Sequence, residues 1–177
     1  MSIRYDELAT PIGALVLASS GSKPGQGLCH IEFGGFKETS DRLTAWSERW
    51  YGTREWLRDP QPLAAAAEQL TAYFAGSLDR FDLALDLQGT PFQRKVWTAL
   101  LEVPFGEACS YKDIGIRIGS PKAVRAIGGA NNRNPVPIIV PCHRVIGADG
   151  SMVGYGGGLS IKTFLLQHEG FPLKGRI

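Results

Sequence analysis

A thiol and an imidazole are neighbours in the sequence at Cys142 and His143, and this pair is the part of the chain best suited to chemistry. A thiolate is a good nucleophile, and an imidazole close to a thiol can take its proton, directly or through a water. A cysteine that follows an apolar run such as residues 138–140 is also often an inert core residue. The residues alone therefore leave Cys142 open as either a nucleophile or a packing side chain.

The element expected to carry this pair is a short buried strand, because residues 138–140 are the β-branched run Ile-Ile-Val. Neighbouring side chains on a strand point to opposite faces of the sheet. A link between Cys142 and His143 would then need a bridging water or a turn in the chain.

Two short helices are expected before this strand. Ser110 can cap the first helix, Asp113 follows that cap, and Gly119 ends the helix. The second helix is expected from Pro121 to about Asn131. This spacing is typical of a helix-turn-helix, which places its second helix in a DNA groove. Two helices that only pack in a core would give the same pattern.

The side chains of these two helices divide into packing and binding groups. Those expected to face inward are Ile114, Ile118, Val124 and Ile127. Lys122 and Arg125 lie on the second helix and are available to a partner outside.

The remaining elements are structural in character. Residues 1–36 are expected to form short strands in hairpins, and residues 62–75 have the apolar spacing of a helix. Residues 81–87 alternate apolar and polar side chains, which predicts a half-buried strand. Thr90 opens a further helix, with Gln93 placed to complete a capping box.

Composition separates the two halves of the chain. The 177 residues are 44% hydrophobic and 20% charged, as in a compact soluble protein of one or two small domains. Residues 1–87 hold 8 basic and 12 acidic side chains, whereas residues 88–177 hold 11 and 5. The basic second half favours a polyanionic partner.

The fold class that follows is α/β. A small N-terminal α/β domain of short antiparallel strands plus a helix is expected over residues 1–87. A mainly helical C-terminal domain with the helix-turn-helix is expected over residues 88–177.

Several classes of protein are not expected. No apolar run approaches the roughly 20 residues that a membrane span needs, and the N-terminus lacks the pattern of a signal peptide, so we expect a cytoplasmic protein. Three cysteines without CxxC spacing suggest neither a disulfide framework nor a cysteine zinc site. No metal site is expected at Cys29 and His30.

The segment around the thiol resembles the active-site segment of the alkylguanine-DNA alkyltransferases, the methylated-DNA–protein-cysteine methyltransferases. The resemblance covers roughly residues 90–170 and is only one of layout in the N-terminal half. Its motifs are Thr90-Pro91-Phe92-Gln93, Ser110-Tyr111, Pro121-Lys122-Ala123-Val124-Arg125-Ala126-Ile127-Gly128, Asn134-Pro135-Val136-Pro137, Pro141-Cys142-His143-Arg144-Val145, Gly154-Tyr155-Gly156-Gly157-Gly158 and Leu165-Leu166-Gln167-His168-Glu169-Gly170.

The resemblance implies a catalytic set of five residues. In the family the cysteine at Cys142 accepts the alkyl group, the histidine at His143 takes its proton through a water, and the carboxylate at Glu169 orients that histidine. Asn134 matches a residue that braces the turn before the active-site strand. Tyr111 matches a tyrosine that helps to protonate the departing guanine.

The resemblance also implies residues for DNA and for the alkyl group. Arg125 matches the arginine that enters the duplex where the damaged nucleotide leaves the stack. The other expected DNA-binding residues are Lys122, Ala126, Gly128 and Ser110, and those expected at the alkyl pocket are Tyr155, Gly156, Pro137 and Val145. Gly156 departs from family members that have a serine there, so a hydrogen bond to the base would have to come from the backbone N–H.

The function that these expectations describe is DNA repair. An alkyl group on O6-alkylguanine, and on O4-alkylthymine, would move to Cys142 after the base is flipped out of the duplex. The thioether that forms gives water nothing to hydrolyse, so each molecule would act once and without a cofactor. The expected partner is double-stranded DNA carrying alkylated guanine, bound by a monomer that can cluster on DNA.

Three other readings stay open at this point. A helix-turn-helix regulator without catalysis would explain the basic half but not the thiol-histidine pair. A damage-binding alkyltransferase-like protein is a nearer alternative, but such proteins lack the acceptor cysteine, and Cys142 is present. A cysteine hydrolase would reveal itself by ester or peptide turnover.

Overall fold

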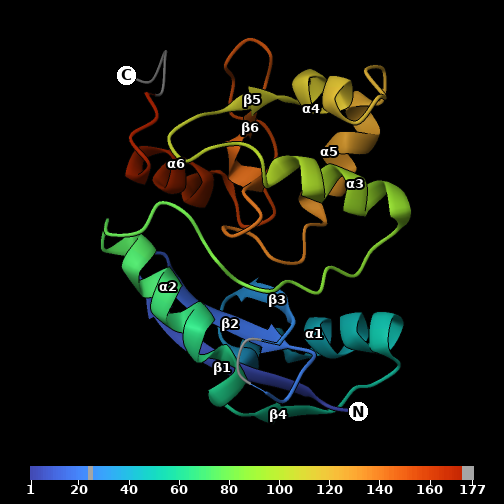
Figure 1. The fold of residues 1–177 in the computed structure, drawn as a ribbon, viewed down its shortest axis with the longest axis vertical. Coiled ribbons are helices and arrows are strands. Elements are labelled where there is room, and N and C mark those ends of the chain that lie inside the picture. Colours follow the sequence, from blue (N-terminus) through green and yellow to red (C-terminus); the bar gives the residue numbers. More distant parts are fainter. Residues whose placement is uncertain (24–25, 173–177) are drawn as a thin grey trace. The chain divides into compact units, whose positions relative to one another are not determined.

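The computed structural model describes residues 1–23 and 26–172, and the chain divides into two compact units, Met1–Gln88 and Gly89–Ile177 (Figure 1). Among the described residues, no helix is long and apolar enough to cross a membrane.

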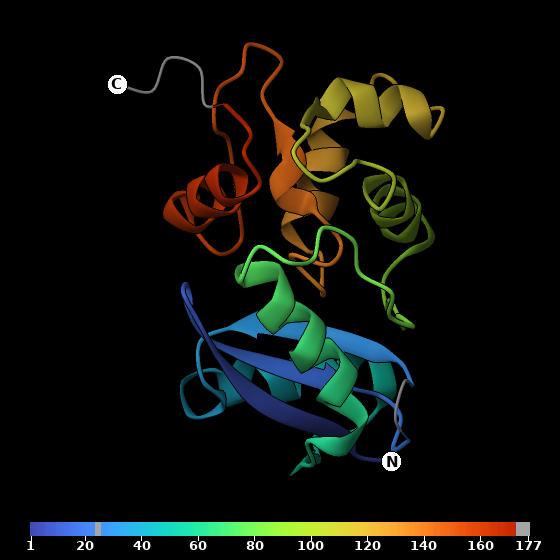
Figure 2. The same cartoon turned by 60° about the vertical axis from the view of Figure 1, so that its left-hand side comes forward.

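The first unit is built on a four-stranded sheet with the strand order β3-β2-β1-β4. Strands β1, β2 and β3 pair antiparallel, and β4 pairs parallel to β1. Figures 1 and 2 show the sheet between helices α1 and α2. The elements are β1 (Ile3–Thr10), β2 (Gly13–Ser19), β3 (Leu28–Phe33), α1 (Phe36–Tyr51), β4 (Trp56–Arg58), the 3-10 turn η1 (Gln61–Leu63) and α2 (Ala64–Phe74).

The expected hairpin strands and the expected helix of this unit are confirmed. Strand β2 is buried at every position from Leu15 to Ser19, as a central strand with two covered faces is. The helix expected over residues 62–75 is present as η1 followed by α2. It closes at Gly76, whose φ of 82° is readily available only to glycine.

The strand expected over residues 81–87 is wrong. Only Leu85 forms a bridge, with Leu28 of β3. The backbone N–H and C=O of Asp82 are instead bound by the side-chain amide of Gln69 on α2, at 2.8 and 2.9 Å. A side chain therefore satisfies the groups that a neighbouring strand would have paired.

The second unit is mainly helical, as expected. The 3-10 turn η2 and the short strand β6 lie between α6 on one side and helices α3, α4 and α5 on the other (Figures 1 and 2). Strand β6 pairs parallel with β5. The elements are α3 (Pro91–Leu100), β5 (Cys109–Ser110), α4 (Tyr111–Arg117), α5 (Val124–Asn132), η2 (Cys142–Arg144), β6 (Val145–Ile146) and α6 (Leu159–His168).

Both expected helix starts in this unit are confirmed by capping boxes. The hydroxyl of Thr90 accepts from the N–H of Gln93, whose side chain accepts from the N–H of Thr90. Ser110 and Asp113 make the same reciprocal pair at the start of α4. Each box satisfies two N–H groups that have no partner within the helix.

The two-helix unit α4–α5 is present, but its second helix begins later than expected. Residues 120–123 form a turn in which the N–H of Ala123 donates to the carbonyl of Ser120, and α5 starts at Val124. Val124 is 43% exposed and does not pack inward, whereas Ile127 is buried. Gly115 permits the tight approach of this turn to α4, because a Cβ there would lie 2.8 Å from the carbonyl oxygen of Ser120.

The strand expected over residues 138–140 is also wrong, although the segment is buried as expected. Prolines at 135, 137 and 141 remove three backbone donors from this stretch. The N–H of Val140 donates within the segment, to the carbonyl of Val136 at 2.9 Å. The thiol therefore follows a compact loop and lies in the 3-10 turn η2.

Candidate active site

The loop before the thiol is held by the side chain of Asn134. Its Oδ1 accepts from the N–H of Val136 at 3.0 Å, and its Nδ2 donates to the carbonyl of Val140 at 2.8 Å. Between these two points Ile138 has a φ of 77°, the only positive φ of a non-glycine residue in the described part of the chain. A β-branched residue in this region is strained, and full burial of Ile138 keeps it there.

Cys142 opens η2, and its side chain is almost fully enclosed. The residue is 4% exposed. Burial raises the pKa of the Cys142 thiol to about 11, although a hydrogen bond with Asn134, the positive charge of Lys162 and a hydrogen bond with Tyr155 oppose that rise. At neutral pH the thiol carries its proton, so a nucleophilic Cys142 needs a base.

His143 has the geometry of such a base. Its side chain is fully buried, and its Nε2 lies 2.7 Å from Oε2 of Glu169. With Nε2 donating to a carboxylate, Nδ1 carries the lone pair, and no described residue gives Nδ1 a hydrogen bond. Burial lowers the pKa of His143, more than the hydrogen bond and charge of Glu169 raise it. The neutral imidazole can therefore accept a proton at Nδ1.

The 3-10 turn changes the relation between the two side chains. Successive residues of a 3-10 helix point about 120° apart, whereas those of a strand point about 180° apart. The two side chains therefore do not point to opposite faces, as they would on a strand.

Glu169 follows α6 and is held in its charged form. Arg144 donates from Nε to Oε1 at 2.8 Å and from Nη2 to Oε2 at 3.1 Å. Burial alone would raise the pKa of Glu169, but the hydrogen bonds from His143 and Arg144 outweigh burial and lower it far below the ordinary range.

Lys162 is a member of the site that sequence reasoning missed. Its side chain is fully buried, and its ammonium group donates to the carbonyls of Val145 at 2.5 Å and Val153 at 2.8 Å. Burial lowers the pKa of Lys162 to about 8, against the attraction of Cys142. Its position three and four residues before the buried Leu165 and Leu166 places it on the inner stripe of α6, and that spacing was the available signal.

Arg144 and Asn131 were missed as well. Arg144 follows the Cys-His pair directly and is 7% exposed, which is unusual for an arginine. Asn131, at 2% exposed, donates from Nδ2 to the carbonyl of Cys142 at 3.2 Å. The resemblance gave neither residue a role, and no spacing rule marks them.

The tyrosines expected at the site lie around the thiol. The hydroxyl of Tyr111 donates to the carbonyl of Val153 at 3.4 Å. Burial raises the pKa of Tyr111, and the charge of Cys142 adds to that rise, which places the two groups within electrostatic reach. The hydroxyl of Tyr155 is buried and interacts with the thiol.

The other residues expected at the alkyl pocket are divided between core and surface. Pro137 and Val145 are buried, and Gly156 is exposed. A Cβ at Gly156 would lie 3.5 Å from the carbonyl oxygen of Asn132, which is an ordinary contact distance. Glycine at this position is therefore not required by lack of space.

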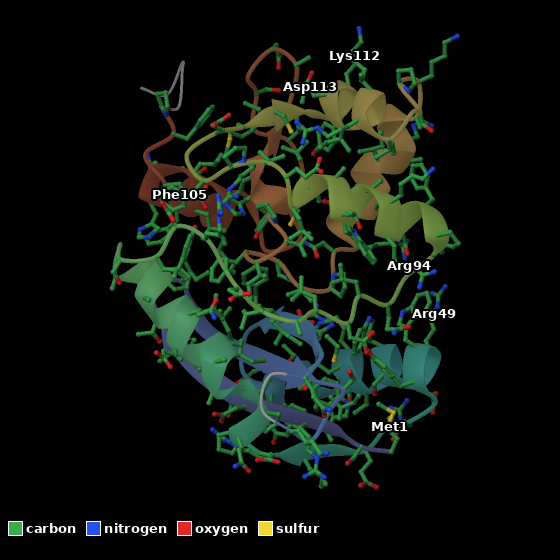
Figure 3. All side chains as sticks on the ribbon, in the orientation of Figure 1. Met1, Arg49, Arg94, Phe105, Lys112 and Asp113 are labelled. Atoms are coloured by element: carbon green, nitrogen blue, oxygen red, sulfur yellow. The ribbon has the colours of Figure 1, made fainter. Side chains whose placement is uncertain are left out.

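The residues expected to bind DNA lie on or beside α4 and α5. Lys122, Arg125 and Ala126 are exposed, and Gly128 and Ser110 are half-buried. Figure 3 shows Lys112, the second residue of α4, pointing away from the unit near Asp113. The exposed end of this helix pair is basic, as a surface for a polyanion would be.

Comparison with known proteins covers nearly the whole chain. Residues 3–87 match the description "6-O-methylguanine DNA methyltransferase, ribonuclease-like domain", and residues 91–171 match "6-O-methylguanine DNA methyltransferase, DNA binding domain". A methylated-DNA–protein-cysteine methyltransferase of Methanosarcina barkeri is 47% identical over 165 residues, 93% of this chain and 96% of that protein. One of Mycobacterium bovis is 45% identical over 168 residues, 94% of this chain and 92% of that protein.

A solved structure gives the same result in three dimensions. The crystal structure of Mycobacterium tuberculosis OGT in complex with DNA aligns with a TM-score of 0.77 and 43% identity. The alignment covers 96% of this chain and 92% of that chain. Both units of this chain therefore have counterparts in one known protein.

Proposed function

We propose, from the premise that the chain belongs to the 6-O-methylguanine DNA methyltransferase family, that Cys142 is the residue that receives the alkyl group. Enzymes of this class repair DNA by alkyl transfer, and the chain is a DNA-repair methyltransferase of that class. The single observation that carries the choice of Cys142 is its place beside a buried histidine whose Nε2 is 2.7 Å from Glu169.

The proposed reaction begins with proton transfer from the Cys142 thiol to Nδ1 of His143, directly or through a water. The thiolate then attacks the alkyl carbon of O6-alkylguanine, a carbon–sulfur bond forms, and the carbon–oxygen bond breaks. The electron pair of that bond goes to guanine, which gains a proton with help from the hydroxyl of Tyr111. One proton leaves the thiol and one enters guanine, so the exchange balances without a co-reactant.

The product fixes the stoichiometry. A thioether has no acyl or imine carbon for water to attack, and nothing in the proposed reaction restores the thiol. Each molecule would therefore transfer one alkyl group.

The direct test is intact-mass measurement after incubation with methylated duplex DNA. We expect one added methyl group per chain, which peptide mapping places on Cys142, and no transfer to C142A, which still binds DNA. C29A and C109A are matched controls that should react like the wild type. A methyl group on Cys29 or Cys109, or repeated turnover by one chain, would contradict the proposal.

Base flipping is the second part of the proposal. The reacting atom lies inside a duplex, so the nucleotide must leave the stack at a cost of about a few kcal/mol. We place Arg125 in the gap that the nucleotide leaves, because Arg125 is exposed in the first turn of α5.

Comparing duplex DNA with free alkylguanine tests this role. We expect R125A to slow repair of saturating duplex and to leave reaction with the free base nearly unchanged, because only the duplex requires flipping. R117A, which removes an exposed arginine on the same helix pair, is the control. Equal losses on both substrates would remove Arg125 from the flipping role, and a loss confined to DNA affinity would make it a phosphate contact.

The proposal extends to O4-alkylthymine as a second lesion and to a monomer that works in the cytoplasm. The same intact-mass assay with DNA carrying O4-methylthymine tests the second lesion. Sedimentation of the protein with and without DNA tests whether it is a monomer.

A further inference from the structure

We propose that Arg144 is a positioning residue that keeps His143 neutral by sharing the carboxylate of Glu169. This inference rests on the proposed function, because it concerns the base that would activate Cys142. It assigns Arg144 an action through Glu169 rather than on the substrate.

The geometry centres on the two oxygens of Glu169. Oε2 accepts from Nε2 of His143 at 2.7 Å and from Nη2 of Arg144 at 3.1 Å. Oε1 accepts from Nε of Arg144 at 2.8 Å and from the N–H of Gly106 at 3.5 Å. A planar guanidinium that binds both oxygens of a carboxylate is a strong and directional pair. The oxygen that faces the histidine is therefore already shared with a cation.

The guanidinium is fixed from its other side as well. Nη1 of Arg144 donates to the carbonyl of Val103 at 2.6 Å. Its Cζ lies 5.9 Å from the centre of the Phe105 ring, which lies in the connection between α3 and β5 (Figure 3). With a side chain only 8% exposed, Arg144 is held by Glu169 after α6 and by the connection between α3 and β5.

The charges around His143 then favour its neutral form. Glu169 and Lys162 act on the imidazole from α6 and its end, Arg144 acts from η2, and the neighbouring titratable group is Cys142. One anion and two cations surround the ring, and proton uptake by His143 would add a third cation to a buried site. Burial is the largest cause that lowers the pKa of His143, and the charges of Arg144 and Lys162 add to it.

A purely structural role, in which Arg144 only holds segments of the unit together, would explain the same contacts. The structural role and the positioning role differ in how the reaction rate depends on pH. Without the cation, Glu169 would attract the imidazolium with its full charge, and the pKa of His143 would rise. The base would then be protonated up to a higher pH than in the wild type, and its neutral form would be recovered in more alkaline solution. A purely structural arginine would instead reduce the rate by the same factor at every pH.

The experiment measures single-turnover methyl transfer from saturating DNA, from mildly acidic to mildly alkaline pH, in R144M, R144K and the wild type. For R144M we expect the acid limb to move up by about one pH unit, the scale of one lost charge, with a rate roughly tenfold lower on that limb and recovery in alkali. R144K keeps the positive charge, so the acid limb of its pH–rate profile should lie at the wild-type pH. R117M removes an exposed arginine and should follow the wild type.

Direct titration of His143 by NMR in the unmodified protein supplies a second readout that needs no variant to fold. We expect the ring to remain neutral below its ordinary value of 6.5 and to carry its proton on Nε2. A His143 that titrates at or above that value, or an R144M profile lowered equally at all pH, would overturn the proposal. Absence of methyl transfer by the wild type would refute the proposed function alone, because the NMR titration is still readable.

Discussion

The chain contains two cysteine–histidine pairs, one in each unit, and their surroundings match group by group. In the first unit Cys29 precedes His30, whose Nε2 lies 3.0 Å from Oε1 of Glu32. The other oxygen of Glu32 lies 3.0 Å from Arg42. The thiol is buried, and Nδ1 of His30 is buried without a hydrogen bond from any described residue.

In the second unit the same order of groups appears as Cys142, His143, Glu169 and Arg144. The backbone separates the two cases first. Cys29 and His30 lie on strand β3, where the register with β2 shifts, and both pack near Trp46 of α1. Cys142 and His143 lie in the 3-10 turn η2 instead.

Charge separates the two thiols next. Burial raises the pKa of Cys29 to about 12, a hydrogen bond with Tyr51 opposes the rise, and the negative charge of Asp86 adds to it. Cys142 has the positive charge of Lys162 nearby instead. The arginines differ too, since the side chain of Arg42 is 68% exposed and that of Arg144 is 8% exposed.

Residue types and pair distances therefore do not distinguish the proposed reactive site from its counterpart. The turn that carries the second pair and the sign of the charge beside the thiol do. The predictions change one of these groups and, as a control, its counterpart in the other unit or an exposed group.

The largest effect is expected on removal of the base. H143A or E169Q should slow single-turnover transfer by about 100- to 10,000-fold, the usual contribution of a general base, with little loss of DNA binding. H30A is the counterpart and should keep the wild-type rate. Unchanged rates in both H143A and E169Q would refute the relay.

A smaller effect is expected on removal of the buried cation. K162M should raise the pKa of Cys142 further and slow transfer by about tenfold, equivalent to about one pKa unit. Alkaline pH should recover part of the rate, because it restores the thiolate. D86N removes the charge beside Cys29 and should leave transfer unchanged. A loss in K162M that follows only its melting temperature would make Lys162 a packing residue.

The smallest effect is expected on stability in acid. The folded-state pKa of Glu169 lies below its ordinary 4.5, so the unfolded chain takes up this proton first, and stability present above 4.5 is lost as pH falls below it. The lowered pKa of His143 acts in the same direction below 6.5. We expect the unfolding free energy of the wild type to fall by up to about 1.4 kcal/mol per pH unit for each proton. E169Q should lack the part of this fall that occurs below pH 4.5. E102Q, in an exposed ion pair, should follow the wild type, and parallel curves for wild type and E169Q would contradict the assignment.

Local signals in the sequence predicted part of the fold well. The helices that open at Thr90 and Ser110 were predicted because their capping boxes lie within four consecutive residues. Helix α1 was not predicted, because the residues it buries are Thr39, Leu43 and Ser47, and two small polar side chains hide the apolar period. The β-branched run 138–140 predicts a strand, but the prolines at 135, 137 and 141 prevent a regular ladder.

The site was predicted less evenly. Cys142 and His143 are neighbours in the chain, but Glu169 entered only through the resemblance, because its contact with His143 spans 26 residues. Lys162 and Arg144 were missed for a common reason. A buried cation depends on carbonyl and carboxylate groups that only the folded chain brings together.

The position of α6 in the chain has a consequence for the newly made protein. Cys142 and His143 leave the ribosome before Lys162 and Glu169, since synthesis runs from the N-terminus. A nascent chain that ends before α6 carries the thiol and the imidazole but neither Lys162 nor Glu169. These two groups are therefore the last part of the site to be translated.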